Sequence, residues 1–285
     1  MSPNKFRRKT SMHKKPYTIV LGNEKGGTGK STASMHVITW LLREGHQVAS
    51  LDIDARQGTL SRYIENRRLR KKNTNEDLPL PQHEAVFKST LANQGEAEAE
   101  DTEKLARIMQ DFKDIDYIVI DTPGSDNFLS RLAHSYADML ITPLNDSFID
   151  LDMLVRVTPD SLDILRPSTY AEMVWEQKKH RAIRDGGSID WVVLRNRLSN
   201  LYSRNKEEMG KVLKALSKRI GFRLIDGFGE RVIFRELFLS GLTLLDLRES
   251  NTPLSLSHIA AKQELATLIE AIQLPQQKQN QELPN

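Results

Sequence analysis

The sequence contains no cysteine among its 285 residues. Disulfide bonds and thiolate-ligated metal clusters are therefore excluded. The sequence also lacks any stretch of about 18 uninterrupted apolar residues, the length that a membrane-spanning helix needs. The net charge is only +3, so any case for nucleic-acid binding must come from how charge is distributed along the chain. These absences predict a soluble, cytoplasmic protein with no membrane partner.

The length of the chain allows one large domain or two small ones, with a full hydrophobic core. Residues 1–16 carry six lysines or arginines and no acid, and they lack the apolar run of a secretory signal. We expect a disordered basic arm there, either simply solvated or weakly attracted to nucleic acid or anionic lipid. Residues 17–274 are predicted to form the folded domain, and residues 275–285 a disordered polar tail.

The most informative stretch is a glycine-rich loop between a short apolar run, residues 17–21, and a longer apolar-rich run, residues 33–42. Strand, glycine-rich loop and helix in this order are typical of a phosphate-binding loop, in which backbone N–H groups and the helix dipole attract phosphate. Lys30 is expected to reach the β- and γ-phosphates, and the Ser31 hydroxyl to ligate Mg²⁺. The predicted nucleotide-binding residues are Glu24, Lys25, Gly26, Gly27, Thr28, Gly29, Lys30, Ser31 and Thr32.

Two further strands are predicted to end in acids beside this loop. Strand 48–51 leads into Asp52 and Asp54, which alternation places on one side, facing the crevice where open α/β sheets bind ligands. Asp52 suits a hydrogen bond to water in the Mg²⁺ shell and Asp54 suits orienting an attacking water, although a solvated acidic pair is the alternative. The apolar strand 117–120 ends in Asp121, which is predicted to lie near Mg²⁺.

The remaining elements complete an α/β fold, a doubly wound and mostly parallel sheet with helices on both faces. Asn196, after a predicted strand at 190–194, can offer an acceptor and a donor to a base edge. Further helices are expected at 59–68, 96–112, 153–165 and from 253 or 255 to 274, and further strands at 138–142 and 223–225.

Residues 204–220 form a predicted amphipathic helix, because apolar side chains recur at helical spacing on one face. The apolar face consists of Met209, Val212, Leu213, Leu216 and Ile220. The opposite face carries Arg204, Lys211, Lys214 and Lys218. This basic face is either merely solvated or a stripe that follows DNA phosphates without reading sequence.

The loop departs from the usual phosphate-binding pattern, because Glu24 replaces its first glycine and a second lysine, Lys25, precedes Gly26. This variant resembles the deviant Walker A motif of the MinD/ParA group of P-loop ATPases. The resemblance implies ATP and Mg²⁺ as ligands and an ATP-dependent homodimer. Each Lys25 would reach the partner subunit's nucleotide, and Lys25, Lys30 and Asp54 would be the catalytic residues. It also implies that Asn196 contacts adenine.

Several members of this group fit the chain poorly. MinD-like membrane cycling needs an amphipathic C-terminal segment, and the polar tail has none. A tyrosine kinase of the group would carry a tyrosine-rich tail, yet the last tyrosine is Tyr202. Tandem-loop anion pumps need a second phosphate loop, and no second copy occurs in the sequence.

Three stretches resemble the MipZ family, which positions the division plane in α-proteobacteria: residues 23–27, 191–198 and 241–247. The resemblance runs from about residue 17 to 274. It implies slow, dimer-dependent ATP hydrolysis, non-specific DNA binding, nucleoid association, interaction with the centromere-binding protein ParB and inhibition of the tubulin-like protein FtsZ. A ParA-type chromosome or plasmid partition ATPase is the alternative within the group. A nucleotide-gated scaffold with negligible turnover is the alternative outside enzymes.

Overall fold

The computed structural model describes residues 15–112, 114–158, 163–198, 204–247 and 255–274. Its strands are β1 (Tyr17–Leu21), β2 (Val48–Asp52), β3 (Gln82–Ala85), β4 (Tyr117–Asp121), β5 (Met139–Asn145), β6 (Val155–Val157), β7 (Ile164–Pro167), β8 (Asp190–Asn196) and β9 (Arg223–Asp226). Its helices are α1 (Lys30–Arg43), α2 (Thr59–Asn73), α3 (Gln94–Asp111), α4 (Phe128–Tyr136), α5 (Phe148–Leu151), α6 (Thr169–Asp185), α7 (Arg204–Ile220), α8 (Ile233–Ser240), the 3₁₀ turn η1 (Leu244–Asp246) and α9 (Leu256–Ile272).

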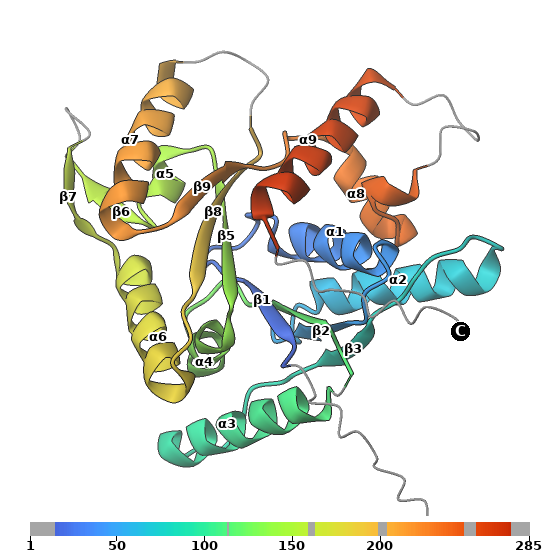
Figure 1. Ribbon diagram of the computed structural model, residues 1–285, viewed down its shortest axis with the longest axis horizontal. Helices are drawn as coiled ribbons and strands as arrows, with labels where there is room; N and C mark the ends of the chain where they lie inside the picture. Colours follow the sequence, from blue (N-terminus) through green and yellow to red (C-terminus); the bar gives the residue numbers. More distant parts are fainter. Residues whose placement is uncertain (1–14, 113, 159–162, 199–203, 248–254, 275–285) are drawn as a thin grey trace, which may run out of the picture.

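A seven-stranded sheet runs through the centre of the molecule in the order β3-β2-β4-β1-β5-β8-β9. Each described pair of neighbouring strands in it is parallel. Helices α1, α2, α8 and α9 cover one face, and α3, α4, α6 and α7 cover the other (Figure 1). The doubly wound parallel sheet expected from the sequence is therefore confirmed.

The central strands are buried on both faces, which explains why their sequences are nearly continuous apolar runs. Along β1, Ile19 and Leu21 pack into the core beneath α1, whereas Val20 packs into the core on the other face. Parallel pairing sets Asp52 at the end of β2 directly beside Asp121 at the end of β4. The loop after β1 and both acids therefore meet at one edge of the sheet.

Most predicted elements lie within a few residues of the observed ones, but the helix expected at 153–165 is wrong. Those residues contribute to β6 and β7, which pair antiparallel with Val155 opposite Pro167. The β-branched residues Val155, Val157 and Ile164 favour strands, and this local preference outweighs the apolar spacing that suggested a helix. Helices α4, α6 and α8 and strand β3 were not predicted. Within the described residues no helix is both long and apolar enough to cross a bilayer.

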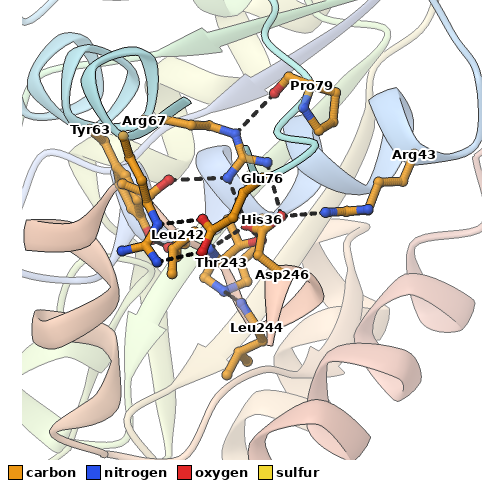
Figure 2. Close-up of polar contacts among 12 residues, drawn as sticks. His36, Arg43, Tyr63, Arg67, Glu76, Pro79, Leu242, Thr243, Leu244 and Asp246 are labelled. Carbon is orange, nitrogen blue, oxygen red and sulfur yellow. Dashed lines mark hydrogen bonds and ion pairs between the residues drawn. The ribbon is translucent and has the colours of Figure 1, made fainter. Parts of the chain in front are cut away.

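A buried ion-pair cluster joins α1, α2 and η1 (Figure 2). The Arg67 guanidinium is fully buried, and it donates to both carboxylate oxygens of Asp246, at 2.6 and 3.0 Å. It also donates to the carbonyl oxygens of Pro79 and Gly241, at 2.9 and 3.1 Å. Arg43 on α1 donates to Asp246 at 2.6 Å. These charge-assisted bonds compensate for the desolvation of the buried charges.

The backbone around this cluster is equally restricted. Gly241 has a φ of 66°, and a Cβ atom there would lie 2.2 Å from the backbone nitrogen of Arg67, so only glycine fits. The buried His36 ring accepts from the Leu244 N–H at 3.2 Å, and its other nitrogen donates to the Thr32 carbonyl at 2.8 Å. Burial lowers the pKa of His36 to about 4, which keeps this ring neutral. Segment 241–247 thus packs the C-terminal part of the chain against α1 and α2.

We expect Asp246→Ala to lower the free energy of unfolding by about 3–5 kcal/mol, because it leaves the Arg67 guanidinium buried without a counter-charge. Urea denaturation measures this change. Glu76→Ala is the matched control, since it breaks the bidentate pair with Arg70 at the surface. That exposed pair should contribute about 1 kcal/mol or less. Equal effects of the two variants would contradict the role of the cluster.

The cluster should also make stability depend on pH in the acid range. Burial alone would raise the pKa of Asp246, but Arg67 and Arg43 hold it at about 2, below about 3.9 for an unfolded aspartate. A depressed pKa contributes stability above the unfolded value, and that contribution is lost as the pH falls towards 2. The stability difference between wild type and Asp246→Asn should therefore shrink between about pH 4 and pH 2.

Candidate functional site

The loop between β1 and α1 is held in a tight curve by its own side chains and by glycine. The Asn23 side chain donates to the Pro143 carbonyl at 2.6 Å and accepts from the Lys25 N–H at 2.7 Å. Gly27 and Gly29 adopt left-handed φ angles of 74° and 92°. A Cβ on Gly29 would also lie 2.3 Å from the Asn196 side-chain nitrogen. Glycine is therefore required at position 29 by both backbone angle and space.

Lys30 places a positive charge inside this curve. Its ammonium group donates to the carbonyls of Asn23 and Lys25, at 3.1 and 2.9 Å, and the residue is only 8 % exposed. Burial lowers the pKa of Lys30, whereas the carboxylates of Asp121 and Asp54 act in the opposite direction. A desolvated cation ringed by loop backbone suits a polyphosphate chain.

A cavity of about 590 Å³ opens over the loop. Thr28 has its hydroxyl buried without a hydrogen-bond partner among the described residues, so the loop retains unused polar capacity. Gly124 comes close to the loop from the end of β4, where a Cβ would lie 2.8 Å from the Gly26 nitrogen. The cavity is lined by Gly26, Gly27, Thr28, Gly29, Lys30, Ser31, Thr32, Asp54, Gln57, Thr59, Thr122, Pro123, Gly124, Ser125 and Arg197.

Ser31 and Asp121 meet directly at the floor of this site. The Ser31 hydroxyl donates to one Asp121 carboxylate oxygen at 2.5 Å, and the Ser34 hydroxyl donates to the other at 3.2 Å. Asp121 is 2 % exposed, and burial raises its pKa to about 7. The hydrogen bond from Ser31 opposes this rise, while the neighbouring Asp52 adds to it. A carboxylate in these surroundings gains from a nearby cation.

The Asp52 carboxylate is fixed by the chain that follows it. One oxygen accepts from the Asp54 N–H at 3.0 Å, and the other accepts from the N–H and the hydroxyl of Ser61, at 2.9 and 2.8 Å. Asp52 is therefore anchored to the first turn of α2 as well as facing Asp121. Of the three residues predicted around Mg²⁺, Ser31 and Asp121 are joined by a hydrogen bond, and Asp52 lies beside Asp121 on the neighbouring strand.

The residues present fit a magnesium ion held mainly by nucleotide. The described residues contain no group of three histidines or acids able to hold a metal alone. Mg²⁺ commonly takes one or two protein oxygens and completes its shell with phosphate and water. The hydroxyl of Ser31 would ligate the ion, and the carboxylates of Asp121 and Asp52 would bind its water shell. When bound, the ion would neutralise charge on the phosphates.

Asp54 lines the same cavity from the loop after β2. Burial raises its pKa, and the nearby Asp52 charge raises it further, whereas Lys30 acts in the opposite direction. The two acids that the sequence predicted to share one side therefore have different surroundings. Asp52 is anchored by hydrogen bonds, and Asp54 faces the cavity.

The second lysine of the loop has a partner that the sequence analysis missed. Lys25 forms an ion pair with Asp150, whose side chain is 3 % exposed. Asp150 also accepts from the Asn145 N–H at 3.0 Å, which ties it to the end of β5. The cap at Ser147, three residues earlier, predicts a short helix there, but no sequence signal joins Asp150 to the loop.

A second cavity, of about 390 Å³, adjoins the first and shares Gly29, Thr32, Thr59 and Arg197 with it. Asn196, which also lines it, donates to the Thr28 carbonyl at 2.8 Å and accepts from the Phe228 N–H at 3.2 Å. Asn196 therefore connects two loops and keeps one N–H for another partner. The aromatic wall of this second cavity, which was not predicted, consists of Phe228, Phe234 and Phe238.

The predicted basic helix α7 contributes no described residue to either cavity. It lies on the β8–β9 side of the sheet (Figure 1). All five of its predicted apolar residues are buried, which confirms its amphipathic character. Lys211, Lys214 and Lys218 are exposed on the opposite face. Arg204 begins the helix, but its side chain lies outside the described residues. Three of the four predicted cations are thus available at the surface.

A model of the ATPase MipZ family matches residues 17–276. The chain belongs to this family. Membership of an ATPase family supports ATPase activity and nucleotide binding. The match spans β1 to the end of α9, and so includes both cavities and the buried cluster around Arg67. A search of curated protein sequences gives no match.

Solved structures with a similar fold are MinD/ParA ATPases. A McdA–ATP complex from Cyanothece has a TM-score of 0.63 at 18% identity, covering 93% of this chain and 99% of that one. MinD from Pyrococcus horikoshii with Mg-ADP scores 0.53 at 17% identity, covering 90% and 96%. A plasmid partition protein from Borrelia burgdorferi scores 0.52 at 16% identity, covering 90% and 99%. At these identities the similarity establishes the P-loop NTPase fold.

We expect Lys30→Ala to weaken ATP binding by about 100-fold or more, because the phosphates lose several charge-assisted bonds to one buried ammonium group. Isothermal titration calorimetry measures this loss. Lys71→Ala, an exposed lysine on α2, is the control and should bind ATP like the wild type. Unchanged affinity in Lys30→Ala would remove the loop from the nucleotide site.

Proposed function

We propose that this MipZ-family protein is an ATP-dependent dimerising ATPase that positions the cell-division plane. Its ATP dimer inhibits FtsZ assembly, binds DNA without sequence preference and interacts with ParB. The observation that carries the proposal is the loop with two lysines, of which Lys30 lines the cavity and Lys25 pairs with Asp150. The proposed inhibition of FtsZ assembly and the proposed interaction with ParB rest on the family resemblance.

The proposed dimer gives Lys25 a phosphate partner in place of Asp150. The Lys25 ammonium group pairs with Asp150 of its own chain and is about one-third exposed. In the proposed dimer it exchanges this carboxylate for the phosphates of the opposite nucleotide. The γ-phosphate biases the equilibrium towards the dimer because it meets Lys25 only there.

Hydrolysis in the dimer is proposed to depend on positioning and electrostatics, as is usual for phosphoryl transfer. Lys30 and the opposite Lys25 neutralise charge on the transferring phosphate, and Asp54 orients the attacking water. The position of Asp54 on the cavity wall, across from the loop, supports this role. Turnover is slow and serves as a timer for the dimer.

The DNA interface is proposed to be the exposed lysine face of α7. Point charges at helical spacing suffice to follow a phosphate backbone, and base edges need not be read. A dimer presents this face twice, so affinity appears mainly with ATP through two linked patches.

The alternative is a ParA-type partition ATPase, which would use the same site and the same dimer. The fold shared with partition proteins favours neither function over the other. The two proposals differ in output, since only the first requires an effect on FtsZ.

Lys25→Ala and Asp54→Ala should have opposite effects on the dimer. Lys25→Ala keeps monomeric nucleotide binding and stays monomeric with ATP, because the contact across the interface is lost. Asp54→Ala forms a dimer that persists, because the water is no longer oriented. Gel filtration with ATP over time distinguishes the two variants. A dimeric Lys25→Ala or a monomeric Asp54→Ala would reverse the assigned roles.

Replacing Lys211, Lys214 and Lys218 with glutamine should weaken DNA binding and lower its salt dependence. The log–log salt slope should fall by about 3 per subunit if each lysine meets one phosphate. Fluorescence anisotropy with duplex DNA and ATP measures this, and ATP affinity should stay unchanged. The control triple variant replaces Arg68, Lys71 and Lys72 on α2. Equal slopes for the two triple variants would make the α7 face merely solvated.

Division control should require the ATP dimer. Asp54→Ala should inhibit FtsZ assembly for longer than the wild type, and Lys25→Ala should not inhibit it. Light scattering of purified FtsZ with each protein and ATP is the direct test. If neither variant alters FtsZ assembly but chromosome or plasmid inheritance fails in cells, the chain is a partition ATPase.

A further inference from the structure

A third cavity, of about 310 Å³, opens beside the nucleotide site and has no role in the proposed reaction. It lies between the loop after β2, the loop after β4 and the segment that joins β3 to α3. Its walls include Ile53, Asp54, Arg56, Phe87, Lys88 and Pro123. We call it the lateral groove.

The lateral groove combines an apolar wall with a cationic rim. Phe87 is 60 % exposed, and Leu91, four residues further along the same segment, is 49 % exposed. Arg56 and Lys88 are exposed as well. Neither has a hydrogen-bond or ion-pair partner within the part of the chain that the structure describes. An exposed aromatic beside two cations that form no ion pair among the described residues is typical of a binding surface.

The wall that carries Phe87 is held in place from behind by α3. Lys104 donates to the Phe87 carbonyl at 3.0 Å, and the Ser89 N–H donates to Asp101 at 2.7 Å. Asp101 itself is 6 % exposed. This side of the lateral groove is therefore formed before any partner arrives, which lowers the entropic cost of binding.

The other two walls belong to the nucleotide site. Asp54, Pro123 and Ser125 line both the lateral groove and the 590 Å³ cavity over the phosphate loop. A ligand in the lateral groove would therefore contact some of the same residues as a nucleotide in the 590 Å³ cavity. A ligand that orders these segments in one site would change the affinity of the other site.

We infer that the lateral groove is a docking site for an acidic–apolar segment of a partner protein, in which a bulky apolar side chain is flanked by carboxylates. The apolar side chain packs on Phe87, Val86 and Ile53, and the carboxylates pair with Arg56 and Lys88. The choice of occupant rests on this charge complementarity. A γ-phosphate that orders the loops after β2 and β4 favours docking, because the partner segment then binds loops that have already lost part of their conformational entropy. This coupling to nucleotide rests on the proposed function.

The test uses a fluorescein-labelled peptide in which Leu-Phe is flanked on each side by Asp and Glu. Its anisotropy is measured with the full chain and a non-hydrolysable ATP analogue, with ADP, and without nucleotide. We expect the tightest binding with the ATP analogue. A twin peptide with Lys and Arg in place of the acids should bind at least about tenfold more weakly. Equal binding of the two peptides would overturn the inference.

Variants then locate the peptide on the surface. Phe87→Ser should weaken binding by about tenfold, whereas Leu165→Ser, a similarly exposed residue on β7, should not. Arg56→Gln with Lys88→Gln should weaken it about fivefold at low salt and less at high salt, with Lys71→Gln and Lys72→Gln as the control pair. Equal losses in Phe87→Ser and Leu165→Ser would contradict the assignment.

Two further results separate the remaining outcomes. If Phe87→Ser abolishes the ATP-dependent dimer in gel filtration without peptide, the lateral groove is an interface between two copies of this chain, and the inference is wrong. If Lys30→Ala retains ATP affinity, the proposed nucleotide site fails. Peptide binding without nucleotide, lost in Phe87→Ser, would still uphold the docking site itself.

Discussion

The central constraint on this structure is the desolvation free energy of three buried charged groups, those of Lys30, Asp52 and Asp121, at the carboxyl ends of the parallel strands. Lys30, Asp52 and Asp121 are each less than a tenth exposed. Lys30 donates to loop carbonyls, Asp52 accepts from Ser61, and Asp121 accepts from Ser31. Parallel pairing of β2 with β4 forces the two acids together. Burial raises the pKa of Asp121 and lowers that of Lys30, so both groups gain from ligands of opposite charge. A polyphosphate with a divalent cation supplies those charges together.

Three segments of the chain contact the phosphate loop or the acids beside it. Asp52 is tied to Ser61 in the first turn of α2, and α2 is tied to the C-terminal part of the chain through Arg67 and Asp246. Gly124 packs against Gly26 of the loop. Asp150 pairs with Lys25. These contacts connect the phosphate loop and the acids beside it to α2, to the loop after β4 and to the segment after β5.

The buried cluster around Arg67 also changes the interpretation of segment 241–247. In the sequence this stretch supports only a resemblance to a family. In the structure Gly241 allows close approach to α2, and Asp246 neutralises Arg67. This segment therefore fixes the C-terminal helices on α1 and α2. Of these C-terminal helices, α8 lines the 390 Å³ cavity, through residues that include Phe234 and Phe238. Two loops that flank this cavity are joined by Asn196, so its walls are fixed from both sides.

The sequence by itself determined the phosphate loop, the strands that end in Asp52 and Asp121, and the sheet class. These follow from local rules, because glycine spacing, apolar runs and strand-end acids act over a few residues. The tertiary structure decided which distant groups meet: Lys25 with Asp150, Asp52 with Ser61, and the aromatic residues of the second cavity with Asn196. Such contacts depend on how helices and strands far apart in the chain pack, and no local pattern encodes that packing.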